Sequence, residues 1–316
     1  RGIETMERKE VMNVVYSSDD NYVQHAVTSI VSLAQNNKNF KTINIYLIEN
    51  NISIEKRNQV ENLIEKYEQL SLEWINFSKW LKRLKLNMQW DISISAYARL
   101  FISEMLDKNI DKILYLDCDI IVNQSVYDLW NMDIKEYYIG AVQDAVNDNT
   151  KNSVGIESGQ PYYNSGVLLI NLKKWREDNI SEKFLQFIEK HHGKVVHHDQ
   201  GVINGVLKSK IYKLPLKYNV MTIHYIFNRN QIMRYYKEST SFYNEKEIEN
   251  AKEVPSILHY TPSFTVRPWI KGCKHPKKGL YWKYLNMTPW KDLKNQKNQE
   301  KWYIRIINWL YRNFYR

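Results

Sequence analysis

Short apolar runs alternate with helical patterns along the first two-thirds of the chain. The run Met12–Tyr16 is followed by a polar turn and then by apolar residues spaced as on one face of a helix. Five more runs have the length and composition of strands: Ile43–Ile48, Leu70–Ile75, Ile113–Leu116, Ile139–Val142 and Gly166–Asn171. Strands that alternate with helices are typical of an α/β fold with a mostly parallel sheet flanked by helices. Such sheets bind ligands at the carboxyl ends of their strands.

Helical spacing connects most of these runs. We expect helices over 23–34 and 96–106, and further helices around 184–188 and 202–206. Ser53 is predicted to cap another helix, which carries Val60, Leu63, Ile64 and Tyr67. After about residue 280 the pattern weakens into a tail rich in Trp, Lys and Asn. We therefore divide the chain into a lead of residues 1–11 (a tag remnant or disordered segment), a domain at 12–280 and a helical appendage at 281–316.

Composition narrows the class of protein. Of 316 residues, 43% are apolar, which excludes wholesale disorder, and 10 Gly with 7 Pro exclude a collagen-like or linker-dominated chain. No run approaches about 18 apolar residues, so no membrane-spanning helix is expected. The two cysteines, Cys118 and Cys273, exclude a disulfide framework and a Cys-type zinc site. The first residues carry charge without the apolar segment of a secretory signal, and we expect a cytoplasmic protein.

Positive charge is concentrated near the C-terminus. The net charge is +10, and residues 291–316 hold seven basic against two acidic side chains. Read as a helix, this stretch places five apolar residues on one face: Tyr303, Ile306, Ile307, Leu310 and Phe314. A basic amphipathic helix of this kind suits an anionic membrane surface, so residues 300–316 either contact the inner face of the cell membrane or pack on their own domain. No nucleic-acid motif is present, and no nucleic-acid partner is expected.

Two acidic residues mark a candidate metal site. The chain lacks both the GxGxxG fingerprint after its first strand and the GxxxxGK phosphate loop, so a bound nucleotide would need a divalent metal to neutralise its phosphates. Asp117-Cys118-Asp119 follows the apolar run at 112–116, and alternate residues of an extended segment point the same way. Two carboxylates that face one ion suit Mg²⁺ or Mn²⁺. The alternative for this segment alone is a polar turn at the end of a strand.

Histidines supply a second kind of candidate ligand. His259 follows another short apolar run, where it would either add a nitrogen to the metal site and favour Mn²⁺ or serve as a hydrogen-bonded structural residue. Four others, His191, His192, His197 and His198, flank a Gly-Lys loop. Because no cysteine or carboxylate pair accompanies them, we expect them to be solvated rather than to bind zinc.

Two polar segments could bind a nucleotide. In the first, Asp19 could accept the imino N–H of uracil, Asn21 could hold a ribose hydroxyl and Tyr22 could stack on the base. The alternative is the start of a helix, with Asp20 or Asn21 as its cap. In the second, Arg267 could bind a phosphate through two N–H groups, or it could stack on Trp269.

Taken together, an ordered series of motifs resembles the family 8 glycosyltransferases. The series consists of NVVYSSDDNY at 13–22, SISAYARL at 93–100, KILYLDCD at 112–119, YYNSGVLLINLKKW at 162–175, HDQG at 198–201, HY at 259–260 and RPW at 267–269. The resemblance covers roughly residues 12–285. It is greatest to the bacterial lipopolysaccharide and lipooligosaccharide galactosyl- and glucosyltransferases, whereas glycogenin is a more distant relative.

The resemblance implies a Rossmann-like GT-A fold, a UDP-galactose or UDP-glucose donor, Mn²⁺ (with Mg²⁺ as the alternative) and transfer with retention at the anomeric carbon. The metal ligands it implies are Asp117, Asp119 and His259. The donor-binding residues it implies are Asp19, Asn21 and Tyr22 for uridine, Arg99, Asp144, Asn164 and Asp199 for the hexose, and Cys118 between the two acidic ligands. Gln200 would face the anomeric carbon, and Arg267 would stand where the family usually has a lysine on the diphosphate.

The chain departs from the family pattern between His259 and Arg267. The family typically reads His-x-x-Gly-x-x-Lys-Pro-Trp, whereas here the spacing is two residues longer, the glycine is missing and arginine replaces lysine. The positive charge is kept, but arginine and lysine bind phosphate with different geometry.

Retention could follow either of two routes. Double displacement needs a carboxylate nucleophile, but an amide stands at Gln200, so we expect front-face substitution in which the leaving phosphate helps to deprotonate the acceptor. Asp199 is the alternative nucleophile.

Other function classes stay open at this point. The chain could be a catalytically weak nucleotide-sugar-binding protein, a metal-dependent nucleotidyltransferase or a membrane adaptor built around its tail. The acceptor could be a saccharide, a glycolipid such as a lipopolysaccharide core, or the glycan of a surface adhesin extended from a different donor sugar.

Overall fold

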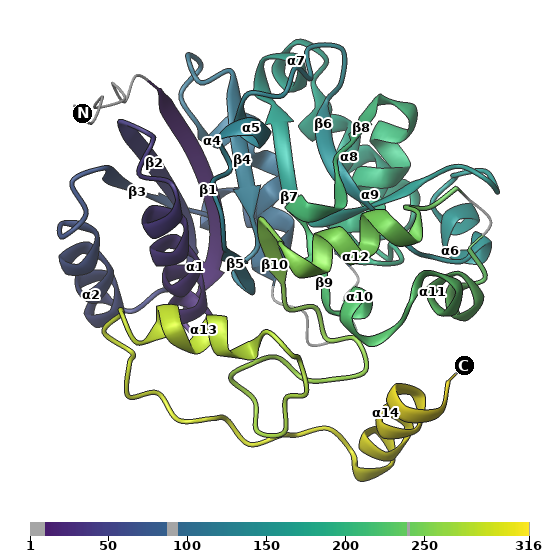
Figure 1. Cartoon of the computed structure of the whole chain (residues 1–316). Helices are drawn as coiled ribbons and strands as arrows, with labels where there is room; N and C mark the ends of the chain where they lie inside the picture. The colour runs from purple at the N-terminus through teal and green to yellow at the C-terminus, as the bar shows by residue number, and fades with distance from the viewer. Residues whose placement is uncertain (1–9, 87–93, 239–240, 316) are drawn as a thin grey trace, which may run out of the picture.

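Seven strands form one sheet in the part of the chain that the structure describes. The computed structural model describes residues 10–86, 94–238 and 241–315. The strand order is β3-β2-β1-β4-β7-β6-β8, and β7 alone runs antiparallel to its neighbours (Figure 1). The bounds are β1 Val11–Asp19, β2 Thr42–Asn50, β3 Leu70–Asn76, β4 Lys112–Leu116, β6 Ile139–Asp144, β7 Tyr162–Asn171 and β8 Ile211–Lys213. The predicted mostly parallel sheet is confirmed, and the run predicted at Gly166–Asn171 is the second half of the antiparallel strand.

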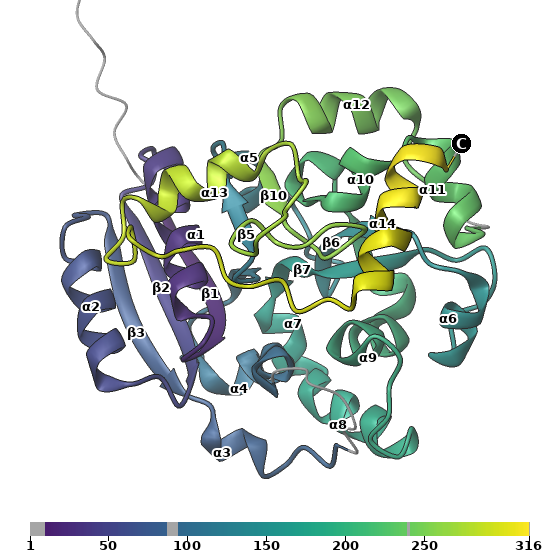
Figure 2. The same cartoon turned by 90° about the horizontal axis from the view of Figure 1, so that it is seen from below.

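Apolar side chains fill both faces of this sheet. Along β1, Val14 and Tyr16 belong to one apolar cluster and Val15 to another, because successive side chains of a strand point to opposite faces. Helices α1 (Val23–Asn36) and α2 (Ile54–Ile64) cover the first face, and α8 (Ile180–Lys190) and α9 (His198–Leu207) cover the second (Figure 2). Burial on both faces explains why the central strands read as continuous apolar runs.

A small second sheet lies beside the end of β4. It consists of β5 (Ile120–Val122), β10 (Ile257–His259) and β9 (Val220–Met221), with β10 in the middle. In its register His259 is opposite Ile120, and the backbone N–H of Tyr260 donates to the carbonyl of Asp119 at 2.9 Å. This pairing carries the imidazole of His259 to the Asp117–Asp119 segment across 140 residues of sequence.

Most of the remaining helices are short, and α14, with 13 residues, is the longest of them. They are α3 Ser78–Leu81, the 3₁₀ helix η1 Ile94–Phe101, α4 Ile102–Met105, α5 Tyr127–Trp130, α6 Asp148–Ser153, α7 Leu172–Glu177, the 3₁₀ turns η2 Lys208–Lys210 and η3 Leu216–Tyr218, α10 Thr222–Ile226, α11 Arg229–Tyr236, α12 Glu245–Glu253, α13 Lys278–Leu285 and α14 Trp302–Phe314. The single helix predicted over 96–106 is therefore η1 followed by one turn of α4. In η1 the side chain of Arg99 turns inward and donates from Nε to the carbonyl of Ala96 at 3.0 Å.

Ser53 precedes α2 as predicted but does not cap it with its side chain. Its hydroxyl donates to Oδ1 of Asp20 at 2.8 Å, and Lys56 pairs with the same carboxylate at 2.8 Å. The polar turn after β1 is therefore tied to the start of α2, and Tyr67 lies beyond the end of that helix.

The C-terminal segment has two parts. Helix α13 packs on α1, where the hydroxyl of Tyr281 lies 2.7 Å from Nδ1 of His25 and that of Tyr284 accepts from Asn36 at 2.7 Å. A long connection then leads to α14, which lies next to α11 at another edge of the molecule (Figures 1 and 2). The predicted boundary at residue 280 falls inside α13. Of the predicted lead, residues 1–9 lie outside the described residues and Val11 begins β1.

Within the described residues, no helix has both the length and the apolar character needed to cross a bilayer.

Candidate active site

A polar pocket of about 670 Å³ opens at the carboxyl ends of β1 and β4. Its lining comes from the turn after β1, from η1, from the segment after β4 and from the segment that follows β10. The lining residues are Ser17, Ser18, Asp19, Asn21, Tyr22, Ser95, Ala96, Arg99, Tyr115, Asp117, Cys118, Asp119, His259, Thr261 and Arg267. This is the position where an α/β sheet binds ligands.

Two carboxylates and one imidazole meet in this pocket. Nε2 of His259 lies 3.2 Å from Oδ1 of Asp119 and 3.8 Å from Oδ2 of Asp117. One ligand atom from each of the three side chains lies within 4.8 Å of the others, and no other group of this kind occurs among the described residues. Two carboxylate oxygens and one imidazole nitrogen are a suitable donor set for Mn²⁺ or Mg²⁺. The residues therefore fit the predicted metal.

A glycine of the antiparallel strand makes room for this cluster. A Cβ atom on Gly166 would lie 2.3 Å from Cε1 of His259 and 2.9 Å from Oδ2 of Asp117. The backbone carbonyl of Gly166 also accepts from the N–H of Asp117 at 2.9 Å. Only a residue without a side chain permits β7 to run this close to both ligands.

A buried asparagine orients the imidazole of His259. Oδ1 of Asn219 lies 3.0 Å from Nδ1 of His259, while Nδ2 of Asn219 donates to Oδ1 of Asn164 at 2.8 Å. Since the amide oxygen can only accept, Nδ1 carries a proton, and Nε2 is the ring nitrogen that faces the carboxylates. Neither Asn219 nor Gly166 stands out in the sequence, because both act through contacts that only the fold creates.

Charge is balanced inside the cluster. Arg267 donates from Nε to Oδ2 of Asp119 at 2.7 Å. Burial raises the pKa of Asp119, but the neighbouring Arg267 and His259 outweigh burial and hold the pKa below its ordinary value. For His259, burial lowers the pKa, but Asp119 outweighs that effect and raises it.

Arg99 joins the acidic cluster to the next group of polar residues. Arg99 is 4% exposed, and its guanidinium lies 2.6 Å from Oδ1 of Asp117 and 3.1 Å from Oδ2 of Asp199 and also donates to the carbonyl of Ser165. Burial raises the pKa of Asp199, and the charge of Arg99 only partly offsets this. The hydroxyl of Ser165 donates to the same Oδ2 at 3.0 Å, so this oxygen already has two partners.

Gln200, Asn164 and Asp144 form a hydrogen-bonded triangle. Nε2 of Gln200 donates to Oδ2 of Asp144 at 3.1 Å, and its Oε1 accepts from Nδ2 of Asn164 at 3.1 Å and from the N–H of Ser165 at 3.1 Å. Nδ2 of Asn164 also donates to Asp144 at 3.2 Å. The orientation of the Gln200 amide is therefore fixed, with its oxygen toward β7 and its nitrogen toward β6.

Asp19, the last residue of β1, holds the turn that follows the strand. Oδ1 of Asp19 accepts from the backbone N–H groups of Asn21 at 3.0 Å and Tyr22 at 3.2 Å. Helix α1 begins at Val23 without a side-chain cap, so neither Asp20 nor Asn21 caps it. The ring of Tyr22 stands edge-on to Trp269, with centroids 6.2 Å apart.

Comparison with known proteins identifies the family. The family model described as glycosyl transferase family 8 matches residues 13–273. The chain belongs to this family. The family 8 resemblance predicted from the sequence is thus confirmed, and the chain is a glycosyltransferase.

Individual relatives agree with the assignment to family 8. General stress protein A of Bacillus subtilis is 28% identical over 293 residues, which cover 92% of this chain and 98% of that protein. A lipopolysaccharide 1,2-glucosyltransferase of Escherichia coli is 28% identical over 302 residues, covering 94% of this chain and 84% of that one. A crystal structure of the galactosyltransferase LgtC with donor and acceptor sugar analogs superimposes with a TM-score of 0.70 at 25% identity, covering 88% of this chain and 96% of that one. The predicted GT-A fold is confirmed.

All the site residues inferred from the family 8 motifs lie in one connected region. Asp19, Asn21, Tyr22, Arg99, Asp117, Cys118, Asp119, His259 and Arg267 line the pocket, and Asp144, Asn164, Asp199 and Gln200 connect to it through hydrogen bonds and the ion pairs of Arg99. The thiol of Cys118 points into the wall, where it donates to the carbonyl of Ser17 at 3.1 Å, and burial raises its pKa.

The other histidines form no metal site in the described residues. The hydroxyl of Tyr162 lies 3.3 Å from Nδ1 of His197, and that of Tyr97 lies 3.5 Å from Nδ1 of His198. His192 and His197 are exposed and His191 is half-buried, as expected for solvated residues.

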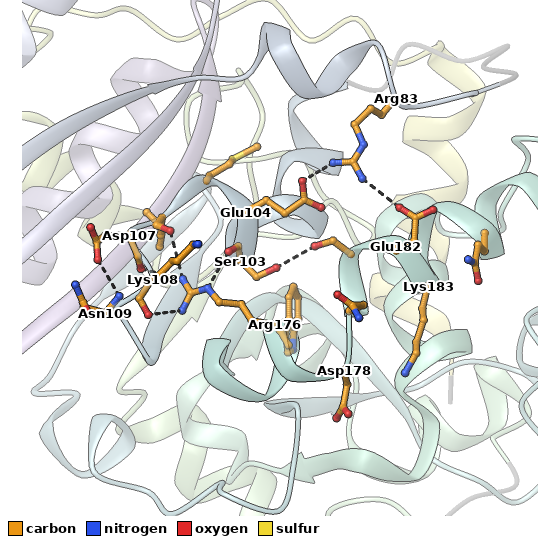
Figure 3. Close-up of a pocket in the computed structure, with 16 residues that line it drawn as sticks. Arg83, Ser103, Glu104, Asp107, Lys108, Asn109, Arg176, Asp178, Glu182 and Lys183 are labelled. Carbon is orange, nitrogen blue, oxygen red and sulfur yellow. Dashed lines mark hydrogen bonds and ion pairs between the residues drawn. The ribbon is translucent and has the colours of Figure 1, made fainter.

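A larger hollow of about 1440 Å³ shares no lining residue with the candidate site (Figure 3). Both of its arginines are engaged with the protein itself. Arg83 bridges Glu104 and Glu182, and Arg176 donates to backbone carbonyls that include those of Ser103 and Ile110.

Proposed function

We propose that the chain transfers galactose or glucose from a UDP-sugar to a saccharide acceptor, with retention at the anomeric carbon and with a divalent ion. The observation that carries the proposal is the Asp117, Asp119 and His259 cluster, which lies in one pocket with Asp19, Tyr22 and Arg267. The relatives support it: one is a lipopolysaccharide 1,2-glucosyltransferase, and LgtC is a galactosyltransferase solved with donor and acceptor sugar analogs.

The pocket offers a separate group of residues for each part of the donor. Asn21 and Tyr22 are available for the ribose and the base, and Asp19 holds their turn in place. Arg267 would bind the diphosphate through its planar guanidinium, which suits two phosphate oxygens at once.

The hexose would extend toward the polar network behind the cluster. Arg99, Asp144, Asn164 and Asp199 would orient its hydroxyls, and Cys118 would line the donor side of the pocket. Fixed donors and acceptors of this kind favour one orientation of the sugar, which lowers the entropic part of the barrier.

The metal would be held by Asp117, Asp119 and His259. Mn²⁺ is the first expectation and Mg²⁺ the alternative, and the bound ion would supply positive charge that stabilises the negative charge of the leaving UDP. The chain's own cation, Arg267, would act on the same developing charge.

We propose front-face substitution as the route to retention. The amide of Gln200, locked between Asp144 and Asn164, would support the anomeric centre from the face opposite the leaving group. Asp199 is the alternative nucleophile, but one of its oxygens already accepts from Ser165 and Arg99. A carboxylate held in this way is poorly placed to form a covalent bond to the sugar.

We further propose that the acceptor is a glycolipid, or a glycoprotein glycan, encountered at the inner face of the cell membrane by a cytoplasmic enzyme. The apolar face of α14 carries the argument. Trp302, Ile306 and Trp309 are 72%, 48% and 49% exposed, and Arg305 lines the same groove as these three. Exposed tryptophans beside arginines suit an anionic lipid surface.

A panel of UDP-sugars would test the main proposal. We expect UDP release from UDP-galactose or UDP-glucose with Mn²⁺, loss of release with EDTA, and loss in Asp117→Asn or Asp119→Asn. Asp133→Asn, at an exposed position that does not line the pocket, is the matched control and should keep full activity. Pyrophosphate release instead of UDP would indicate a nucleotidyltransferase. Tight UDP binding without turnover on any sugar of the panel would indicate a binding protein.

A further inference from the structure

Helix α14 is attached to the rest of the molecule mainly through its last turn. The ring of Tyr311 lies 5.2 Å from Phe264 and 5.4 Å from Tyr235, and the ring of Tyr315 lies 5.1 Å from Phe227. The guanidinium of Arg312 donates to the carbonyl of Phe264. Earlier residues of α14 are exposed, which leaves one turn of the helix to anchor it.

Phe264 is one of the residues that this turn contacts. It stands within the segment 261–266, which is longer than the family pattern, and it adopts a positive φ of 58°. This left-handed conformation is uncommon for a bulky residue and persists only where the surroundings enforce it. Phe227 at 4.9 Å and Tyr235 at 5.0 Å enclose the ring from one side, and Tyr311 encloses it from α14.

The segment leads directly to Arg267, the residue proposed to bind the diphosphate. Three residues after Phe264, Arg267 donates to Asp119, and two residues further Trp269 stacks on His25 at 3.7 Å. At its other end the segment begins next to His259. The two ends are thus fixed by the site and by the core. The middle is held by Phe264 with its aromatic neighbours and by Thr265, whose hydroxyl accepts from the backbone N–H of Lys274 at 2.8 Å.

We propose that α14 is a positioning element of the donor site: its last turn holds Phe264 and thereby sets the place of the Arg267 guanidinium. The proposal rests on the proposed function, because it assigns α14 a role in binding the donor diphosphate. It also gives the longer segment a use, since the additional residues supply the contact surface for the helix.

Two readouts test this role. The first is hydrogen–deuterium exchange of the amides at 261–267, which requires no ligand. The second is the calorimetric Kd for UDP and for uridine in the presence of Mn²⁺, because uridine lacks the diphosphate that Arg267 would bind. The test variant is Tyr311→Ala with Arg312→Ala, and the conservative variant is Tyr311→Phe, which keeps the ring. Trp302→Ala, exposed on the first turn of the same helix, is the control.

We expect the double variant to exchange faster at 261–267 and to bind UDP about tenfold more weakly, while its uridine affinity changes less than twofold. Tyr311→Phe and Trp302→Ala should behave like the parent chain. Unchanged exchange and unchanged UDP affinity in the double variant would overturn the role of α14, and so would an equal loss for UDP and uridine. A parent chain that fails to bind UDP would instead contradict the proposed function itself.

Discussion

Arg267 donates from Nε to Oδ2 of Asp119 at 2.7 Å, so the cation expected on the donor diphosphate is bonded to an expected metal ligand. Both side chains are largely buried, and a buried carboxylate without a partner would be costly. The ion pair therefore stabilises the ligand cluster when no ion is bound. If an ion and a donor bind as proposed, we expect the guanidinium to exchange the carboxylate for phosphate oxygens.

Replacing Arg267 should separate these two roles. In Arg267→Ala, Mn²⁺ no longer competes with a guanidinium for Asp119, so we expect the affinity for Mn²⁺ without nucleotide to rise several-fold. The affinity for UDP in the presence of Mn²⁺ should fall by about tenfold, or ~1.4 kcal/mol, because a charge-assisted contact is lost. Titration calorimetry measures both, and Arg267→Lys, which keeps the charge without the planar fork, should fall in between. Equal changes of the same sign in the Mn²⁺ and UDP affinities would contradict the idea that Arg267 leaves Asp119 to bind phosphate.

Adding a methyl group at Gly166 should damage the metal site specifically. The new Cβ would press on His259 and Asp117, so Gly166→Ala should lower the affinity for Mn²⁺ at least about tenfold and cost roughly 1–3 kcal/mol of stability. Gly279→Ala is the matched control, because nothing lies within 4 Å of a Cβ built there. Mn²⁺ binding followed by electron paramagnetic resonance, with thermal unfolding in parallel, checks both effects. Normal binding in Gly166→Ala would show that the cluster tolerates the methyl group.

The sequence led us to predict the charged residues of the site, but not those that position them. Asp117, Asp119 and His259 could be named because they stand in motifs that resemble the family 8 pattern, whereas each segment alone left a structural alternative open. Asn219 and Gly166 could not, since an asparagine and a glycine acquire their roles from the register of β9, β10 and β7. No local pattern contains that register.

The C-terminal helix shows a different limit of sequence reasoning. An apolar stripe at helical spacing reveals that one face avoids water, but it does not identify what covers that face. The predicted stripe, which includes Ile306 and Leu310, is exposed, whereas Tyr311 and Tyr315 pack on the domain. The contact of Arg312 with Phe264 joins residues 48 positions apart in the sequence, and only the fold places the two together.

Gln200 should matter more for turnover than for donor binding. Its amide would support the reacting carbon, so in Gln200→Ala we expect kcat to fall by about 100-fold while the Kd for UDP stays within about threefold. Gln186→Ala, on the exposed side of α8, is the control. Steady-state kinetics and calorimetry separate the two constants, and equal losses in both would contradict the assigned role. A glycosyl adduct on Asp199 or Gln200, detected by mass spectrometry, would replace front-face substitution with double displacement.

Acid should destabilise the fold through His25, a buried histidine next to Tyr22. Burial lowers the pKa of His25 from 6.5 to about 3, although the charge of Asp119 partly opposes it. Because the folded-state pKa lies below the unfolded one, the stability contributed by the neutral ring is complete above pH 6.5 and is lost as the pH falls toward 3. Between pH 6.5 and about 4.5 this amounts to about 2 kcal/mol. Denaturant unfolding at the two pH values should show a smaller difference for His25→Gln than for the parent chain and for the exposed control His192→Gln.

The exposed face of α14 should bind anionic lipid, and its residues are not those that contact Phe264. Ile306→Ser with Trp309→Ser removes apolar area from the outer face and leaves Tyr311, Arg312 and Tyr315 in place. At about 25 cal/mol per Å² of apolar surface, this change should weaken binding to vesicles of phosphatidylglycerol and phosphatidylcholine by at least about tenfold. Sedimentation with these vesicles, and with phosphatidylcholine alone, measures the effect.

The parent chain should bind only the anionic vesicles and should lose binding as salt is added, because dissolved ions screen the charge of Arg305 and its neighbours. UDP affinity should be unchanged in this variant, and a parent chain that ignores anionic vesicles would rule out the membrane contact while leaving the donor site intact.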